Sequence, residues 1–204
     1  MFSVVRSVLA GVVVSLLLLL IHRYKPLTKK IAIGSAIGWI VLSLALSFLP
    51  FENSFVTFSS PEAAYKYYYP TASPYQIIKG NESDLVLGDG RDGTTTILIV
   101  PKNEDGWKVG IGSEINTVYN GIAGTLPVQI HRYKDSNDYY ITVFGEHGKE
   151  LSISDNRGST FASDLQLRNV YRAHIADMNR QYELTVNGEK IDLFQAKHIL
   201  INKL

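Results

Sequence analysis

The sequence predicts a two-helix transmembrane hairpin followed by a β-rich α+β extracytoplasmic region. Three observations predict it: two long apolar runs near the N-terminus, a short basic segment between them, and β-type segments separated by turn residues in the rest of the chain. Of the 20 Lys and Arg and 19 Asp and Glu in the 204 residues, residues 1–50 hold five cations and no acid. Residues 51–204 therefore hold 15 cations and 19 acids, a net charge of −4, which disfavours a basic nucleic-acid-binding protein.

The apolar runs at residues 4–21 and 31–49 predict two membrane spans, because about 20 apolar residues cross the hydrocarbon layer. Arg6 is compatible with the first span if its charge reaches the interface. The loop 22–30 holds four Lys or Arg, so it is expected in the cytoplasm, with both chain ends outside. This makes residues 1–50 a two-span anchor in the lipid bilayer and predicts a multi-pass cell-membrane protein with an extracytoplasmic C-terminal domain.

Two alternatives to the anchor are weaker. A cleaved signal peptide would need more positive charge before the first run and a small-residue cleavage site after it, and the sequence has neither. The second run is too long and too uniformly apolar for an ordinary core helix.

Small residues at helical spacing mark the predicted packing faces of these helices, namely Ser7, Gly11, Ser15, Gly34 and Gly38. Small side chains let two helix backbones approach closely. The expected contact is within one chain, and a homodimer through the transmembrane helices is the alternative. No ionisable residue lies in the middle of either run, which disfavours a channel or transporter.

Residues 51–112 predict a helix packed on an antiparallel sheet. Ser60 is a typical N-cap, Pro61 suits the first helical position, and Pro70 ends the helix. Pro61, Ala64, Tyr65 and Tyr68 fall on one face of this helix, whereas Glu62, Lys66 and Tyr69 are expected in solvent.

Strand-like runs follow, with turn-rich segments between them, and most are shorter than eight residues. They lie at residues 75–78, 85–87, 94–100, 107–111, 128–133, 139–144, 151–153, 170–175, 182–186 and 190–194. Asn187-Gly188 is the strongest hairpin signal, and Asp105-Gly106 is a similar one. A boundary near residues 112–124 would separate this first module from a second one. The second module, residues 113–204, is predicted to be a small β-sandwich or open barrel. The two modules could also form one continuous domain.

A basic-looped N-terminal anchor, the SPEAAYKYY helix and the VPKNEDGWKV hairpin together resemble uncharacterised membrane-anchored exported proteins of Gram-positive bacteria. The resemblance covers mainly Ser60–Val109 and rests on structural motifs. It implies the outer face of a single cytoplasmic membrane and a cystatin-like or NTF2-like layout for the first module. It transfers no functional residue.

The sequence contains no recognisable catalytic, metal or cofactor motif. Ser154-Asp155-Asn156 matches one motif of penicillin-recognising enzymes, but the S-x-x-K nucleophile motif is missing and a turn is the simpler interpretation. The loop at residues 88–93 lacks the ligand spacing of a calcium loop, so a hairpin loop is expected. His131 and His174 could share a site if their strands pair, although solvated positions are the more ordinary interpretation. There is no cysteine.

The tyrosines offer the only candidate binding surface. Tyrosine suits a protein or glycan surface as well as a core, and core packing is the more ordinary role. Exposure of Tyr67 and Tyr69 together would favour binding.

The sequence therefore predicts a membrane-tethered, non-enzymatic domain that binds a protein or cell-envelope ligand, without nucleic acid or cofactor. One alternative is an accessory subunit of a larger membrane complex, which would use the small-residue faces of the helices. The other is an envelope hydrolase with an unfamiliar site, since a fold alone does not exclude an activity.

Overall fold

The structure is a computed structural model that describes residues 2–24, 28–48, 55–109, 115–134, 136–191 and 193. Contacts divide the chain into two compact units, Met1–Phe55 and Val56–Leu204. The two predicted modules beyond residue 56 therefore lie in one unit.

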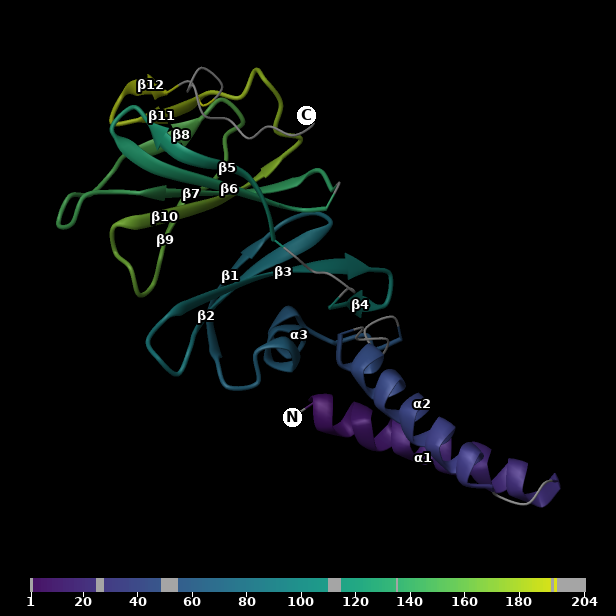
Figure 1. Cartoon of the computed structure of the whole chain (residues 1–204). Helices are drawn as coiled ribbons and strands as arrows, with labels where there is room; N and C mark the ends of the chain where they lie inside the picture. Colours follow the sequence, from purple (N-terminus) through teal and green to yellow (C-terminus); the bar gives the residue numbers. More distant parts are fainter. Residues whose placement is uncertain are drawn as a thin grey trace. The chain divides into compact units, whose positions relative to one another are not determined.

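The first unit is a hairpin of two helices, α1 (Phe2–Tyr24) and α2 (Lys29–Phe48), which pack side by side (Figure 1). Residues 25–27 and 49–54, with part of the predicted loop and the end of the second predicted span, lie outside the described residues. Both helices are apolar around their whole circumference and leave large side chains such as Leu19 and Ile33 exposed.

The structure corrects the prediction of a transmembrane hairpin. Within the described part of the chain, no helix combines the length and the apolar character that a membrane crossing requires. The charged residues of the two helices are Arg6 and Arg23 in α1 and Lys29 and Lys30 at the start of α2. The predicted spans at 4–21 and 31–49 are not supported. The multi-pass membrane localisation and the extracytoplasmic placement of residues 51–204 lose their basis with them.

The second unit begins with helix α3 (Pro61–Tyr68) on a four-stranded antiparallel sheet. Ser60 caps α3 as predicted, since its Oγ accepts a hydrogen bond from Ala63 N at 3.2 Å. The sheet has the order β1-β2-β3-β4, with β1 (Ser73–Lys79), β2 (Ser83–Asp89), β3 (Thr95–Asn103) and β4 (Gly106–Trp107). The central position of β3 agrees with its sequence, which is apolar on both faces.

The rest of the unit contains two further sheets. The five-stranded sheet has the order β5-β6-β7-β10-β9, with β5 (Ile115–Ala123), β6 (Leu126–Tyr133), β7 (Asp138–Phe144), β9 (Ala162–Ser163) and β10 (Val170–Ala176). The three-stranded sheet has the order β12-β11-β8, with β8 (Ile153–Asp155), β11 (Leu184–Val186) and β12 (Glu189–Ile191). These two sheets enclose the largest apolar core, to which Val128, Ile141, Ile175 and Leu184 contribute. Together they form the sandwich that was one of the predicted alternatives.

Two sequence predictions about strands are wrong in detail. Strand β5, which the sequence analysis did not predict, occupies residues 115–123 and pairs with β6. The turn before Trp107 consists of Glu104 and Asp105, because Asn103 pairs with Gly106. In contrast, Asn187 and Gly188 form the predicted hairpin turn, with φ values of 51° and 85°.

Candidate functional site

The face of the five-stranded sheet that meets the first sheet is unusually polar. The register aligns His131 of β6, Tyr140 of β7 and His174 of β10 in one row across three neighbouring strands. Asp138 and Arg172 lie on the same face, because side chains alternate along a strand. The opposite face carries Ile141, Val143 and Ala173 into the sandwich core, so a single sheet separates an apolar core from a buried polar layer.

Asp138 is the centre of this polar layer. Its carboxylate accepts hydrogen bonds from the backbone N–H groups of Glu82 and Ser83, both at 2.7 Å, and from His174 Nε2 at 2.7 Å. It also accepts from Asn81 N at 3.1 Å and Ser83 Oγ at 3.0 Å. Burial raises the pKa of Asp138, but the hydrogen bonds from His174 and the backbone outweigh it and lower the pKa to about 2. The carboxylate therefore fastens the β1–β2 turn to β7.

Ser83, Asp138 and His174 do not form a nucleophilic triad. In such a triad the histidine lies between serine and carboxylate and takes the serine proton. Here the carboxylate lies between the other two groups, and Ser83 Oγ also contacts Tyr140 OH at 2.9 Å. Tyr140 OH in turn donates to Ser83 O at 2.8 Å. The arrangement holds two sheets together and does not activate the serine.

A second buried group joins the same two sheets. Asp164 forms an ion pair with Arg172, and both side chains are almost fully buried. Tyr75 of β1 donates to Asp164 Oδ2 at 3.2 Å. Burial raises the pKa of Asp164, but hydrogen bonds from Leu167 N and Gln166 N and the nearby Arg172 lower it overall. This ion pair is therefore charged at neutral pH and sits at the junction of the sheets.

His131 is buried beside these groups and is not a metal ligand candidate. Its Nδ1 lies 3.3 Å from Thr117 Oγ1. Burial and the charge of Arg172 lower its pKa to about 4. His131 and His174 do not meet, because β7 lies between their strands. Within the described residues, no cluster of His, Asp and Glu could hold a metal ion.

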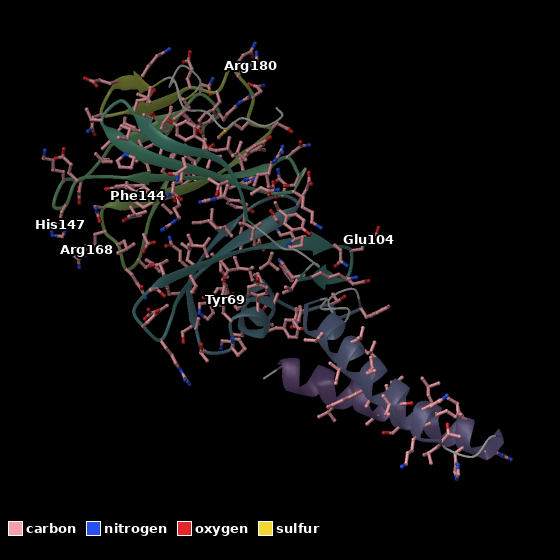
Figure 2. The ribbon with its side chains drawn as sticks, viewed as in Figure 1. Tyr69, Glu104, Phe144, His147, Arg168 and Arg180 are labelled. Carbon is pink, nitrogen blue, oxygen red and sulfur yellow. The ribbon has the colours of Figure 1, made fainter. Side chains whose placement is uncertain are left out.

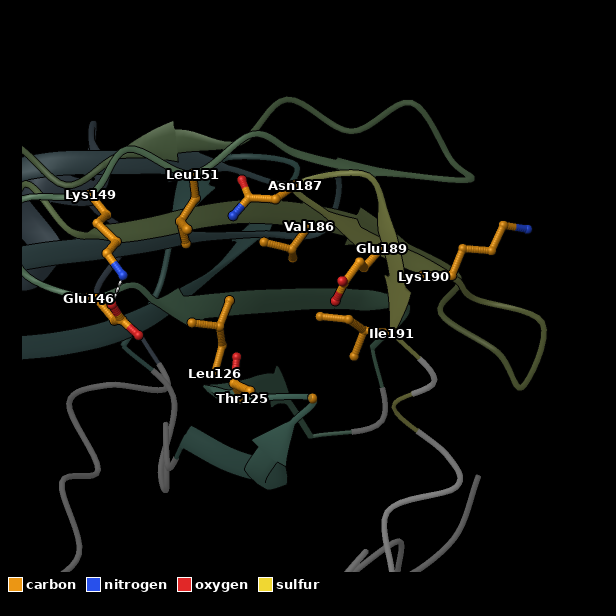
Figure 3. A pocket seen from close by; sticks show the side chains of 11 residues that line it. Thr125, Leu126, Glu146, Lys149, Leu151, Val186, Asn187, Glu189, Lys190 and Ile191 are labelled. Carbon is orange, nitrogen blue, oxygen red and sulfur yellow. Dashed lines mark ion pairs between the residues drawn. The ribbon is translucent and has the colours of Figure 1, made fainter.

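Two cavities lie on either side of the loop that follows β7. Cavity A has a volume of about 520 Å³ and lies between the sheets of the sandwich at one end (Figure 3). Its floor is formed by Leu126, Leu151, Val186 and Ile191. At its edge Glu146 forms an ion pair with Lys149, while Lys190 extends away and pairs with Glu183 at 2.8 Å.

Cavity B has a volume of about 800 Å³ and lies on the other side of the same loop. Its basic lining residues are His147, Lys149 and Arg168, and its only acidic one is Glu150. Lys149 and Leu151 line both cavities.

Hydrogen bonds at both ends hold the loop between the cavities. Gly145 N donates to Asn169 O at 2.6 Å, and Asn169 Nδ2 donates to Gly145 O at 2.8 Å. Leu151 N donates to Tyr171 OH at 3.1 Å. Beyond it, Ser152 N donates to Asn187 Oδ1 at 3.0 Å and Asn187 N donates to Ser152 O at 2.8 Å. The walls of both cavities are therefore positioned before a ligand binds.

The structure places the predicted tyrosine surface partly against the core. Tyr67 and Tyr69 are half-buried and pack on the cluster beneath α3. The Tyr67 ring centroid lies 5.2 Å from that of Phe58, and the Tyr69 centroid lies 5.4 Å from that of Tyr65. Tyr68, predicted to be buried, is exposed instead. The helix ends at Tyr68, and the non-helical backbone of Tyr69 turns its ring inward. A binding role for Tyr67 and Tyr69 stays a prediction.

The predicted small-residue faces are only partly used between α1 and α2. A Cβ on Gly11 would lie 3.2 Å from Trp39 Nε1, so glycine permits this contact. At Gly34 and Gly38 an added Cβ would meet nothing within 4 Å. Ser15 Oγ donates to Gly11 O within its own helix at 2.7 Å. The side chain of Ser7 lies outside the described residues. Contact with a second chain or a larger complex through this face stays a prediction.

The other motifs have structural roles. Ser154 and Asp155 end strand β8, and Asp155 Oδ1 accepts from Arg157 N at 3.1 Å and Ser159 N at 2.8 Å in the turn that follows. The glycine-rich segment after Asp89 connects β2 to β3, and Gly90 N donates to Thr94 O at 2.8 Å. Both agree with the simpler interpretation of each motif.

Sequence reasoning missed Asp138, Asp164 and both cavities. An aspartate as the first residue of the apolar strand β7 is a detectable signal, but its partners are far away in sequence. The residues of cavity A come from three separate turns. No family model, curated protein or solved structure matches the chain. The resemblance to exported proteins of Gram-positive bacteria stays a prediction.

Proposed function

We propose that the protein is a non-enzymatic binding protein whose sandwich takes a small amphipathic ligand into cavity A. The observation that supports this most directly is the composition of the cavity, whose apolar floor is bordered by charged and polar groups. Pockets of about 300–1,000 Å³ with an apolar lining and a few polar groups commonly bind small molecules. The apolar part of the ligand would contact Leu126, Val186 and Ile191.

The placement of the perturbed titratable groups supports binding over catalysis. Active sites usually bring such groups into a pocket. In this protein the buried Asp138, His131 and Tyr140 have shifted pKa values, yet none of them lines cavity A or cavity B. The hydrogen bonds of Asp138 and Tyr140 connect two sheets, and this structural role explains their burial. An enzyme with an unfamiliar site is therefore the weaker candidate.

A fluorescence titration tests the proposal with the full chain and 8-anilinonaphthalene-1-sulfonate, an amphipathic dye with an apolar body and one charge. Ile191→Glu places a charge at the cavity floor, and Ile122→Glu is the matched control on β5, where Ile122 is 64% exposed. We expect Ile191→Glu to weaken dye binding by about tenfold, since a buried charge opposes an apolar contact. The control variant should bind as the parent does.

The exposed apolar side chains of α1 and α2 are the same in both variants and bind the same amount of dye. A difference in dye binding between Ile191→Glu and Ile122→Glu therefore reports on cavity A. Because Ile191 also packs against the sandwich core, a second variant, Thr125→Trp, fills the cavity from an exposed turn. Equal binding by the parent, Thr125→Trp and Ile122→Glu would contradict the proposal.

A further inference from the structure

We infer that cavity B is a second binding site, which takes an oxyanion of the phosphate type. The inference is independent of the proposed function, because its test uses Arg168, which does not line cavity A, and it does not require cavity A to be occupied. The walls of cavity B come from the loop after β7 and from the turn between β9 and β10.

Cations from both walls face the same cavity. His147 and Lys149 belong to the first wall and Arg168 belongs to the second. Figure 2 shows His147 and Arg168 near each other, with Arg180 in a separate part of the molecule. All three side chains are exposed, so their hydrogen-bond donors are available to a ligand.

Hydrogen bonds hold the two walls of cavity B in place. The paired hydrogen bonds between Gly145 and Asn169 join the two segments at the base of the cavity. The second wall is held by Asp164, whose Oδ1 accepts from Gln166 N at 2.8 Å and Leu167 N at 2.9 Å. Arg168 follows directly, so its position is set by a buried anchor.

The charge balance of cavity B favours an anion. Lys149 and Arg168 oppose one acid, Glu150, and His147 adds a further donor. The ion pair of Lys149 with Glu146 joins two largely exposed side chains, and such pairs contribute little and exchange readily. Lys149 can therefore turn to a ligand in cavity B.

Cations on opposite walls favour phosphate over carboxylate. A carboxylate has two oxygens in one plane, which a single arginine can satisfy. A phosphate group carries about two negative charges and three strong acceptor oxygens, so it can be contacted from both walls at once. Neutral polar groups of Gln166, Asn169 and Tyr171 also line the cavity and could contact the rest of a phosphate ester.

The test is a titration of the full chain with inorganic phosphate at constant ionic strength, followed by isothermal calorimetry and by NMR shifts of the amides of residues 145–151. A titration with sodium acetate tests whether a carboxylate binds instead. A titration with sodium chloride measures the nonspecific effect of salt. Arg168→Gln removes one cation of the site, and Arg180→Gln is the control with the same change in net charge at an exposed position outside both cavities.

We expect phosphate to bind with saturation and to shift the amides of the 145–151 loop. Arg168→Gln should weaken this binding by about tenfold or more, as expected when a charge-assisted pair is lost. Arg180→Gln should leave it unchanged. Equal effects of phosphate and chloride, tighter binding of acetate, or an Arg168→Gln variant that binds phosphate like the parent would each overturn the inference. Both substitutions are at exposed side chains, and an unchanged melting temperature would verify the fold.

Discussion

The two faces of the first sheet are buried in different ways. The face under α3 packs Val86, Leu98 and Val100 against Ala64 and Tyr65, and Tyr65 OH contacts Thr96 Oγ1. Asp84 is buried on the same face, where it accepts a hydrogen bond from Trp107 Nε1 at 2.7 Å and pairs with Lys102 Nζ at 3.0 Å. The face toward the five-stranded sheet buries Leu85, Leu87 and Ile99 against Tyr140.

The second face adds the ion pair of Asp164 with Arg172 and the hydrogen bonds of Asp138. The contact between α3 and the sheet is mainly apolar, and an apolar contact tolerates small shifts. Fixing one sheet on another at a defined position uses directional polar groups, and these carry a larger penalty when one partner is lost.

The largest expected effect separates the two faces directly. Asp164→Ala would leave Arg172 buried without its ion-pair partner, so we expect a loss of about 4 kcal/mol in the free energy of unfolding. Urea-induced unfolding at pH 7 measures this value. Glu183→Ala is the control, since its ion pair with Lys190 is exposed and should contribute less than about 1 kcal/mol.

The double variant Asp164→Leu with Arg172→Met sharpens the comparison. It replaces both charges by apolar groups and should recover the part of the stability that Asp164→Ala loses through the unpaired charge of Arg172. The hydrogen bonds of Asp164 with Gln166 N and Leu167 N stay lost in both variants. If Asp164→Ala cost no more than Glu183→Ala, the polar layer would not be the fixed junction described above.

The next largest effect is a pH dependence of the stability, and it arises from His131 in the polar layer between the two sheets. The pKa of His131 is lowered to about 4 in the folded protein, from about 6.5 in the unfolded chain. The unfolded state therefore binds a proton first as the pH falls. The stability that His131 contributes is present above pH 6.5 and is lost progressively between pH 6.5 and pH 4. This loss should reach about 3 kcal/mol at pH 4, because one pKa unit corresponds to about 1.4 kcal/mol.

Chemical unfolding of the parent and of His131→Gln at several pH values between 4.5 and 7 measures this contribution. The slope of unfolding free energy against pH should be shallower in His131→Gln, whereas His147→Gln, at an exposed position, should keep the parent slope. Identical slopes in all three proteins would show that His131 is not buried in its neutral form.

The smallest effect concerns the apolar face. Ser60→Ala removes the side-chain acceptor for Ala63 N at the start of α3, and we expect a loss of about 1 kcal/mol. Thermal unfolding measures it, with Ser154→Ala at an exposed position of β8 as the control. A loss as large as that of Asp164→Ala would mean that α3 is a principal determinant of the fold, and the contrast between the faces would disappear.

Local signals predicted much of the secondary structure. The cap at Ser60, the alternating strands and the turn at Asn187-Gly188 all act between residues close in sequence, and the structure contains each of them. Strand β5 was missed because its glycine and asparagine residues resemble those of a connecting segment, although it pairs with β6 on both sides of an irregularity between Thr117 and Tyr119. The membrane anchor was predicted from apolar runs, whereas no described helix has the length and apolar character for a membrane crossing.

The sequence by itself determined the β-rich character of the second unit, helix α3 and its cap, and the hairpins, because these depend on side-chain periodicity and on turn residues within a few positions. Only the tertiary structure decided that Asp138 meets the turn at Asn81–Ser83 and that Asp164 meets Arg172 and Tyr75. It also decided that His147 and Arg168 share a cavity. These contacts join residues on different strands and loops, and a hydrogen bond or an ion pair between distant segments leaves no periodic pattern in either one.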